Sequence, residues 1–502
     1  MIAPVSRFTI VQPTASLADP HILSDIRDRR SIIDSIYDAL IRRGEDGSYE
    51  PWLALSWDVD TSSRHWRFSL RPDVRCHDGG TLEAADAAAS ILRAISPDLP
   101  GELGTQGVLR GYLEGSTVSA IDSTTLAIST PTPMADLLDL LVDIPMVPKR
   151  AHALLPGQAV GSGPYALAFA GPGRVELHAF SSHWAGKPPV GQLLWLADPD
   201  PDSRISLLRD GHADLVVEPP RTFATTDEAH LLSTPGYLCV IFMFNLFDGP
   251  CRDVRVRRAL THAVDVDALI ADDGIAGGAA VRLAGPLTPL HAGNDPASRP
   301  YLYDPDYARS LIQAAGFTKG LELDIDLPAR FPDESILLAQ RVAEFLAAVG
   351  VTAWLHVHED RPDYAEKIRT KRFGDLCCFD SSPASSWRVY CEKLDARRQG
   401  PWWQGYRNDT VHDLLDQAAV TGDMNRRTEL LRKISNIAHQ DVPWLFLYAP
   451  HNRWALGDAA SGWRPSVEGR VRIIASDPNH SPSHKQENNT PWFSPNAQPS
   501  ST

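Results

Sequence analysis

Hydrophobic and polar residues alternate along much of the chain in two rhythms, one typical of strands and one typical of helices. Strands are predicted over residues 6–11, 66–70, 121–130 and 174–180. Helices are predicted over 32–41, where apolar residues follow a helical spacing, and over the alanine-rich stretch from about Thr81 to Ile95. Thr81 is the expected N-cap of that second helix. Strands and helices that alternate in this way indicate α/β layers.

One short apolar run, Leu376–Phe379, predicts a buried strand because it is too short for a helix and a turn follows it. Ser381 and Pro383 form that turn, so we expect Asp380 at the end of a core strand, with its side chain facing a cleft. Aromatic rings and one guanidinium follow: Trp387, Arg388, Trp402, Trp403 and Tyr406. With a carboxylate, these groups suit a pocket for a small polar ligand. The alternative is that the tryptophans belong to the core and Asp380 caps the next segment.

Length and composition exclude several classes of protein. The chain has 502 residues, which allows two to four domains at roughly 100–200 residues each. The formal net charge is −15, which argues against a nucleic-acid surface and against docking on anionic lipid. The six cysteines form no Cys-x-x-Cys motif, so neither a zinc ribbon nor a thioredoxin-like site is expected. No run of about 18 apolar residues occurs, so no membrane-spanning helix is expected.

Two local patterns could indicate a cofactor, but their context argues against one. Residues 161–166 fit the GxGxxA dinucleotide fingerprint, which must follow a strand and open a helix. Here Pro164 interrupts the pattern, and a strand is predicted after it. His356 and His358 would lie on one face of a strand as a candidate metal pair, but no third ligand is near them in the sequence. We prefer an ordinary polar strand face and expect neither a metal nor an organic cofactor.

A series of short motifs runs through the chain in a fixed order. The first part contains Leu53-Ala54, Ser56-Trp57, Leu70-Arg71, His77-Asp78-Gly79 and Ala85-Asp86. Further along come Gly161–Tyr165, Trp184–Pro188, Gly211–Asp214, Asp253–Ile270 and Tyr303–Phe317. In this order the ten motifs resemble those of the family 5 solute-binding proteins, the peptide, dipeptide, nickel and opine receptors of bacterial ABC importers. The resemblance covers roughly Ser6 to Ile474, and Gly80 stands where the family usually has another small or polar residue.

The resemblance implies an α/β fold in which a two-lobed periplasmic-binding-protein clamp, type II-like, carries an extra inserted domain. Lobe I would be discontinuous and would take residues 1–35, 155–236 and 444–474. Residues 36–154 would form the inserted second domain, and residues 237–443 would form lobe II with much of the ligand pocket. Residues 475–502 are rich in Pro, Ser and Asn and poor in aliphatic residues, which predicts a disordered tail.

The resemblance also implies roles for residues near the turn after Asp380. In peptide-binding members an aspartate after the core strand of the second lobe receives the ligand's ammonium, and Asp380 falls at that place. Arg388 could take a ligand carboxylate, or it could pair with Glu392 one helical turn later. Phe244 and Asn245 could supply a backbone edge. The expected ligand-binding set is Asp380, Ser381, Trp387, Arg388, Trp402, Trp403, Tyr406, Phe244 and Asn245.

The resemblance implies a monomeric, non-catalytic receptor that hands a small peptide, an opine or another zwitterionic ligand to ABC permease subunits in the periplasm. The N-terminus lacks a basic segment followed by an apolar core, so the chain as written carries no secretory signal, unless the true start codon lies upstream. One alternative is therefore a cytoplasmic enzyme or biosynthetic accessory protein built on the binding fold, although no nucleophile and base occur at a recognisable spacing. Another is a cytoplasmic ligand sensor, for which no DNA-binding segment is found.

Overall fold

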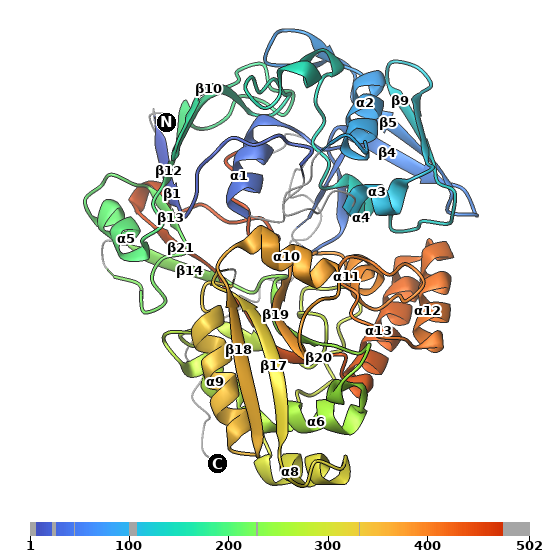
Figure 1. Ribbon diagram of the computed structural model, residues 1–502. Coiled ribbons are helices and arrows are strands. Elements are labelled where there is room, and N and C mark those ends of the chain that lie inside the picture. The colour runs from blue at the N-terminus through green and yellow to red at the C-terminus, as the bar shows by residue number, and fades with distance from the viewer. Residues whose placement is uncertain are drawn as a thin grey trace, which may run out of the picture.

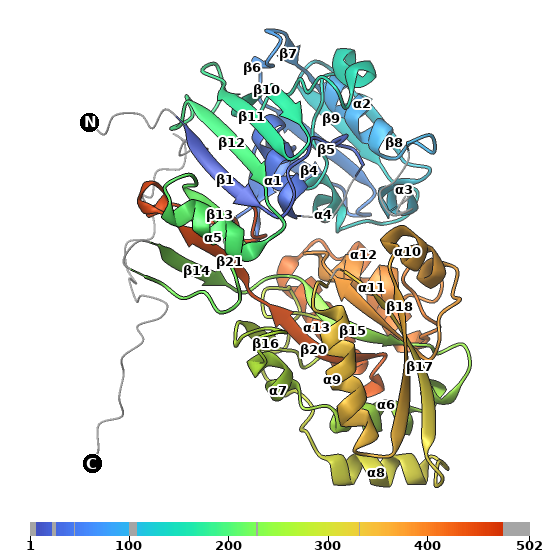
Figure 2. The same ribbon diagram turned by 60° about the vertical axis from the view of Figure 1, so that its left-hand side comes forward.

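The computed structural model describes residues 7–22, 27–44, 46–99, 108–226, 229–330 and 332–474. Figures 1 and 2 show two lobes, the upper coloured mostly blue to green and the lower mostly yellow to orange, joined along one side by strands that pass between them. The predicted disordered tail lies outside the described residues. Within the described part of the chain, no helix is both long enough and apolar enough to cross a membrane.

The first lobe is built on a seven-stranded sheet whose strands come from three separate stretches of the chain. In sheet order they are β10 (Tyr165–Gly171), β11 (Arg174–Ala179), β12 (Gln192–Ala197), β1 (Phe8–Gln12), β13 (Leu215–Val217), β21 (Asn452–Leu456) and β14 (His230–Thr234). Helix α1 (Arg27–Ile36) shares a core with Ile10 on one face of the sheet. Helix α5 (Pro201–Arg209) shares another core with Val11, which points to the opposite face. A short turn of helix, η4 (Asp458–Ala460), follows β21.

A second domain adjoins the first lobe and is built on a four-stranded antiparallel sheet. Its strands are, in order, β4 (Ala54–Val59), β5 (His65–Leu70), β9 (Thr125–Ser129) and β8 (Thr117–Ala120). The same part of the chain holds two small strand pairs, β2 (Ile41–Arg43) with β3 (Tyr49–Pro51) and β6 (Val74–Arg75) with β7 (Thr81–Leu82). Its helices are α2 (Ala84–Ala94), α3 (Val108–Leu113), α4 (Leu137–Leu141) and η2 (Lys149–Leu154).

The predicted starting points of one helix and one strand in this domain are wrong. Thr81 lies in β7, and the N-cap of α2 is Glu83, which forms a capping box with Asp86. The strand predicted over 121–130 begins only at Thr125, because residues between β8 and β9 form the turn that reverses the chain.

A buried aspartate, Asp38, connects the first lobe to the second domain. Its carboxylate accepts hydrogen bonds from Trp52 Nε1 at 2.7 Å, from Ser162 Oγ at 2.7 Å and from Trp184 Nε1 at 3.2 Å. The three donors lie in, or directly beside, three of the motifs found in the sequence. Those motifs therefore mark this junction between domains.

Glycine is required on both sides of Ser162. A Cβ atom at Gly161 would lie 2.1 Å from the carbonyl oxygen of Ile36, and one at Gly163 would lie 2.5 Å from its carbonyl carbon. The Gly163 N–H donates to that carbonyl at 2.9 Å, so α1 ends at Ile36 instead of continuing to residue 41 as predicted. Residues 161–166 do not open a helix, as a dinucleotide fingerprint would require, because Tyr165 begins strand β10. The prediction that a strand and not a helix follows this motif is therefore confirmed.

The second lobe is built on a six-stranded sheet. In sheet order its strands are β16 (Ala280–Arg282), β20 (Trp444–Pro450), β15 (Cys239–Phe244), β19 (Leu376–Ser381), β17 (Leu321–Pro328) and β18 (Val351–His358). Its helices are η3 (Pro250–Arg252), α6 (Val254–Ala263), α7 (Val266–Ala271), α8 (Pro305–Ala314), α9 (Ser335–Ala347), α10 (Arg361–Arg369), α11 (Ser386–Lys393), α12 (Asp409–Val420) and α13 (Met424–Asp441). Cys377 and Cys378 lie in two different cores, so these neighbours point to opposite faces of β19.

The chain passes between the lobes twice, from β14 to β15 and from β20 to β21. The predicted boundary of lobe I at residue 444 is corrected by this topology, because β20 pairs with β15 and β16 in the second lobe. The chain leaves that lobe only after Pro450. The other domain boundaries stay predictions.

Candidate ligand-binding site

Asp380 is the last residue but one of strand β19, so it lies at the end of a core strand, as the apolar run predicted. Its Oδ1 accepts from Nη2 of Arg361, the first residue of α10, at 3.1 Å. In both views α10 lies on the side of the second lobe that faces the first (Figures 1 and 2). Asp380 does not cap the following helix, because the N-cap of α11 is Ser385, whose side chain accepts from a backbone N–H of that helix.

The aromatic residues predicted to wall the pocket occupy three separate places. Trp402 lies on Phe379, the neighbour of Asp380, with ring centroids 4.7 Å apart. Trp387 is buried against Tyr112 of the second domain, with centroids 4.8 Å apart. Trp403 Nε1 donates to the carbonyl of Tyr406 at 2.6 Å. Of the three tryptophans predicted to line the pocket, Trp402 is the one that the structure places beside β19, the strand that carries Asp380.

The remaining predicted residues make contacts within the second lobe. Arg388 Nε donates to Glu392 Oε1 at 3.1 Å, so the alternative of an ion pair along α11 is confirmed. Phe244 is fully buried, and its N–H donates to the Pro443 carbonyl. The backbone N–H of Asn245 is likewise used, since it donates to a carbonyl within the lobe at 2.8 Å. These N–H groups are therefore committed to the fold and cannot also serve a ligand.

The turn after Asp380 is held by a histidine that the sequence did not single out. His291 Nε2 donates to the Pro383 carbonyl at 2.9 Å, and its Nδ1 accepts from the Thr288 N–H at 3.1 Å. Burial lowers the pKa of His291 to about 4, so the ring is neutral near pH 7, as this pair of bonds requires. Ser381, predicted to lie in the turn, is instead the last residue of β19, and within the described chain its buried Oγ has no hydrogen-bond partner.

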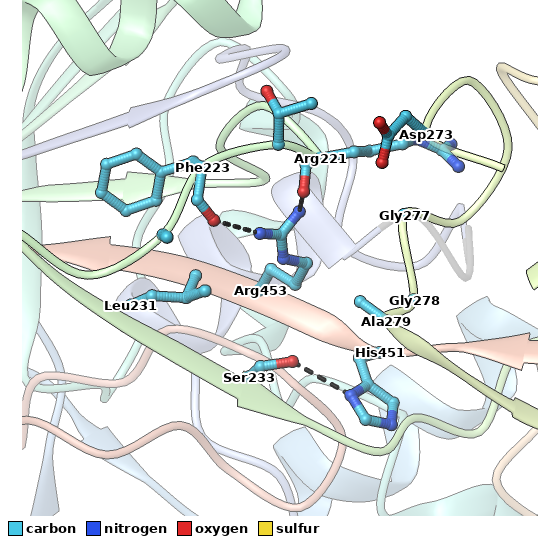
Figure 3. Close-up of a pocket in the computed structure, with 12 residues that line it drawn as sticks. Arg221, Phe223, Leu231, Ser233, Asp273, Gly277, Gly278, Ala279, His451 and Arg453 are labelled. Atoms are coloured by element: carbon cyan, nitrogen blue, oxygen red, sulfur yellow. Dashed lines mark hydrogen bonds between the residues drawn. The ribbon is translucent and has the colours of Figure 1, made fainter. Parts of the chain in front are cut away.

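A cavity of about 540 Å³ opens at the hinge, between the two lobes (Figure 3). Its lining comes from the loop after β13, from β14, from the crossing segment and from the loop after α7: Arg221, Thr222, Phe223, Ala224, Leu231, Ser233, His451, Arg453, Asp273, Gly277, Gly278 and Ala279. We call this cavity the hinge pocket.

Polar contacts in and beside the hinge pocket hold its walls in place. Arg453 donates to the carbonyls of Arg221 and Phe223 at 2.9 and 2.8 Å, so it shapes the loop of the first lobe (Figure 3). Arg221 in turn donates to Glu334 at the start of α9, at 2.8 Å. This ion pair joins the two lobes directly. Asp333 precedes Glu334 in the sequence. Burial raises the pKa of the Asp333 carboxyl above its usual value, and the nearby charges of Glu218 and Glu334 raise it further.

The strand register places the hinge pocket and Asp380 along the same edge of the six-stranded sheet. Val240 of β15 pairs with Asp380 on one side and with Tyr448 of β20 on the other. The Tyr448 hydroxyl donates to Glu334, the residue that binds Arg221, at 2.7 Å. Two strand spacings of about 4.8 Å separate Asp380 from Tyr448. The two sets of groups therefore belong to one polar edge that faces the first lobe.

The lobes also meet away from the hinge, where the second domain contacts α11 to α13. The Ala135 N–H donates to the Ala419 carbonyl at 2.9 Å, and Arg427 Nη1 donates to the Ala135 carbonyl at 2.7 Å. Tyr112 donates its hydroxyl to Glu392 at 3.2 Å. The upper and lower lobes therefore contact each other in two places, at the hinge through Arg221 and Glu334 and away from it through α11 to α13.

The two histidines considered as a metal pair each bind an aspartate of the neighbouring strand. His356 Nε2 lies 2.7 Å from Asp324 Oδ1, and His358 Nε2 lies 2.6 Å from Asp326 Oδ1. No group of three or more His, Cys, Asp or Glu side chains arranged to hold a metal ion occurs among the described residues.

Residues 48–377 match the family model of the bacterial extracellular solute-binding proteins, family 5 Middle. The chain belongs to this family. The family consists of transport-binding proteins, so this family 5 protein is a solute-binding protein, as the motif series predicted. Its α/β fold is the two-lobed clamp of that family.

Relatives and solved structures agree with this assignment. The family 5 protein is 26% identical over 437 residues to the dipeptide-binding protein of Escherichia coli (strain K12), covering 79% of this chain and 80% of the relative. It is 26% identical over 463 residues to the glutathione-binding protein GsiB of Pectobacterium atrosepticum, covering 87% of each. Its fold is similar to that of HbpA2 from Haemophilus parasuis, with a TM-score of 0.79 and 20% identity over 93% of this chain and 99% of that one.

Proposed function

We propose that this protein binds a zwitterionic small molecule, such as a short peptide or an opine, between its lobes and delivers it to the permease of an ABC importer. The observation that carries the proposal is the Asp380–Arg361 pair, which sets an anion and a cation side by side on the polar edge. Hydrogen bonds between charged groups are about twice as strong as neutral ones. The two relatives named above bind, by their names, a dipeptide and glutathione, and both ligands carry charges of both signs.

Under this proposal, some of the predicted site residues contact the solute, and the others hold those residues in place. Asp380 receives the ammonium of the solute, Ser381 offers its unpaired hydroxyl, and Trp402 provides an apolar wall through Phe379. The other members hold partners within the second lobe or against the second domain and support the site: Trp387, Arg388, Trp403, Tyr406, Phe244 and Asn245.

Closure of the lobes is the proposed means of holding the solute. Hinge motion about connecting segments is a known class of domain movement, and here the chain crosses the hinge twice. The Arg221–Glu334 pair, which joins the two lobes, and the hinge pocket both lie beside these crossings. Exclusion of water then strengthens each charged contact with the solute.

The proposal also covers partners and location. The protein acts as a monomer, outside the cytoplasmic membrane, without catalytic turnover and without a cofactor. The formal net charge of −15 supports a carrier that avoids anionic lipid headgroups.

A ligand screen tests the proposed function. We expect at least one zwitterion from a panel of dipeptides, glutathione, free amino acids and opines to raise the melting temperature and to bind one-to-one in native mass spectrometry. Neutral sugars serve as the control class, because they offer no charge to Asp380 or Arg361. Binding of sugars alone, or of no member of the panel, would contradict the proposal.

A further inference from the structure

One nitrogen of Arg361 is buried without a partner among the described residues. Its Nη2 donates to Asp380, whereas its Nη1 is shielded from solvent and makes no hydrogen bond. A buried donor left unpaired destabilises the protein, because it has lost its hydrogen bonds to water. Folded proteins satisfy nearly all such groups, so this one needs an explanation.

Two aromatic rings hold the Arg361 guanidinium in place. Its central carbon lies 5.6 Å from the Phe379 ring centroid and 5.7 Å from that of Tyr364. Asp360 caps α10 and so fixes the backbone from which Arg361 projects. The side chain is only 17% exposed, and it is therefore positioned before any ligand arrives.

The carboxylate of Asp380, which binds Arg361, also has one oxygen without a hydrogen bond to the described residues. Asp380 Oδ1 accepts from Arg361, while Oδ2 makes no hydrogen bond within the described chain. The Asp380 side chain is 23% exposed, so this oxygen remains within reach of a small molecule. One acceptor and one donor of opposite charge thus stand next to each other, each with one bond still to make.

We propose that Arg361 is a specificity-determining residue that binds a carboxylate of the solute through Nη1 while Asp380 Oδ2 binds its ammonium. The inference rests on the proposed function and narrows its ligand class. The Asp380 and Arg361 groups lie 3.1 Å apart, so the matching charges of the solute must also be adjacent. They are adjacent where ammonium and carboxylate share one carbon, as in an α-amino acid head group. An ordinary dipeptide separates these charges by a peptide unit.

Two isomeric dipeptides provide the test. γ-Glutamylglycine carries its ammonium and a carboxylate on one carbon, whereas α-glutamylglycine, with the same atoms, does not. Calorimetric titration of the parent protein is expected to give at least about thirtyfold tighter binding of the γ isomer, the effect of one desolvated charged pair. In Arg361→Gln the two isomers are expected to bind with similar, weaker affinity, and Arg361→Lys should restore part of the preference because it keeps the charge.

Arg369→Gln is the matched control, because Arg369 lies at the other end of the same helix. It should keep the preference of the parent. Melting curves of all variants establish that each is folded. The inference is overturned if the α isomer binds as tightly as the γ isomer, or if Arg361→Gln keeps the preference. If the zwitterions of the panel that bind are ordinary dipeptides alone, whose charges are not adjacent, only this inference fails; if no zwitterion binds, the proposed function fails as well.

Discussion

Replacement of Asp38 by alanine is expected to lower the free energy of unfolding by about 3–5 kcal/mol, the cost of removing one partner from a buried charged network. Three donors, Trp52 Nε1, Ser162 Oγ and Trp184 Nε1, would lose their acceptor at once. The Asp38 side chain is only 2% exposed, so water cannot readily replace the carboxylate. Denaturant unfolding followed by tryptophan fluorescence measures the effect.

Asp58→Ala is the matched control for Asp38→Ala. Asp58 lies on β4 of the second domain and is exposed, so its replacement should change stability by no more than about 0.5 kcal/mol. Equal effects of the two substitutions would show that Asp38 does not hold the first lobe and the second domain together.

Replacement of Asp380 by asparagine is expected to weaken solute binding by about 2–5 kcal/mol, or roughly thirtyfold and more in dissociation constant. The substitution keeps the shape of the side chain but removes the charge that the solute ammonium needs. It also leaves the Arg361 guanidinium without its carboxylate partner. Titration calorimetry with the zwitterion found by the screen measures this change.

The stability of the ligand-free protein distinguishes a binding role for Asp380 from a structural one. The two side chains of the Asp380–Arg361 pair are 23% and 17% exposed, and partly exposed pairs contribute about 1 kcal/mol or less. Asp380→Asn should therefore melt close to the parent, and so should the control Asp363→Asn, which alters an exposed aspartate of α10. Unchanged affinity, or a ligand-free Asp380→Asn protein that unfolds several kcal/mol more easily, would show that the carboxylate serves the fold.

The sequence predicted local features of the site well. The apolar run before Asp380 is strand β19, and the spacing of Arg388 and Glu392 corresponds to an ion pair along α11. The glycines around Ser162 were noticed as a motif, and the structure explains them by their close approach to Ile36. Such features depend on residues that are near one another in the chain, where periodicity and turn chemistry are informative.

The parts of the site that escaped prediction depend on contacts distant in the sequence. Arg361 meets Asp380 only because α10 packs at the end of β19, and nothing in the local pattern indicates that contact. The hinge pocket likewise combines loops that are far apart in the sequence, and Arg221 reaches Glu334 across 113 positions. The error at residue 444 has the same cause, because only strand pairing reveals that β20 belongs to the second lobe. Several of the motif residues proved to stabilise the fold, so the family pattern indicated the architecture better than the ligand contacts.

Binding of the solute between the two lobes is tested most directly by hydrogen–deuterium exchange with and without the zwitterion identified by the screen. Amides in both lobes should be protected together: the end of β19 with α10 in the second lobe, and the loop after β13 in the first. Strands β4 and β5 of the second domain should exchange at an unchanged rate. Protection confined to one lobe, or absent from the end of β19 and α10, would contradict a solute held between the lobes at Asp380.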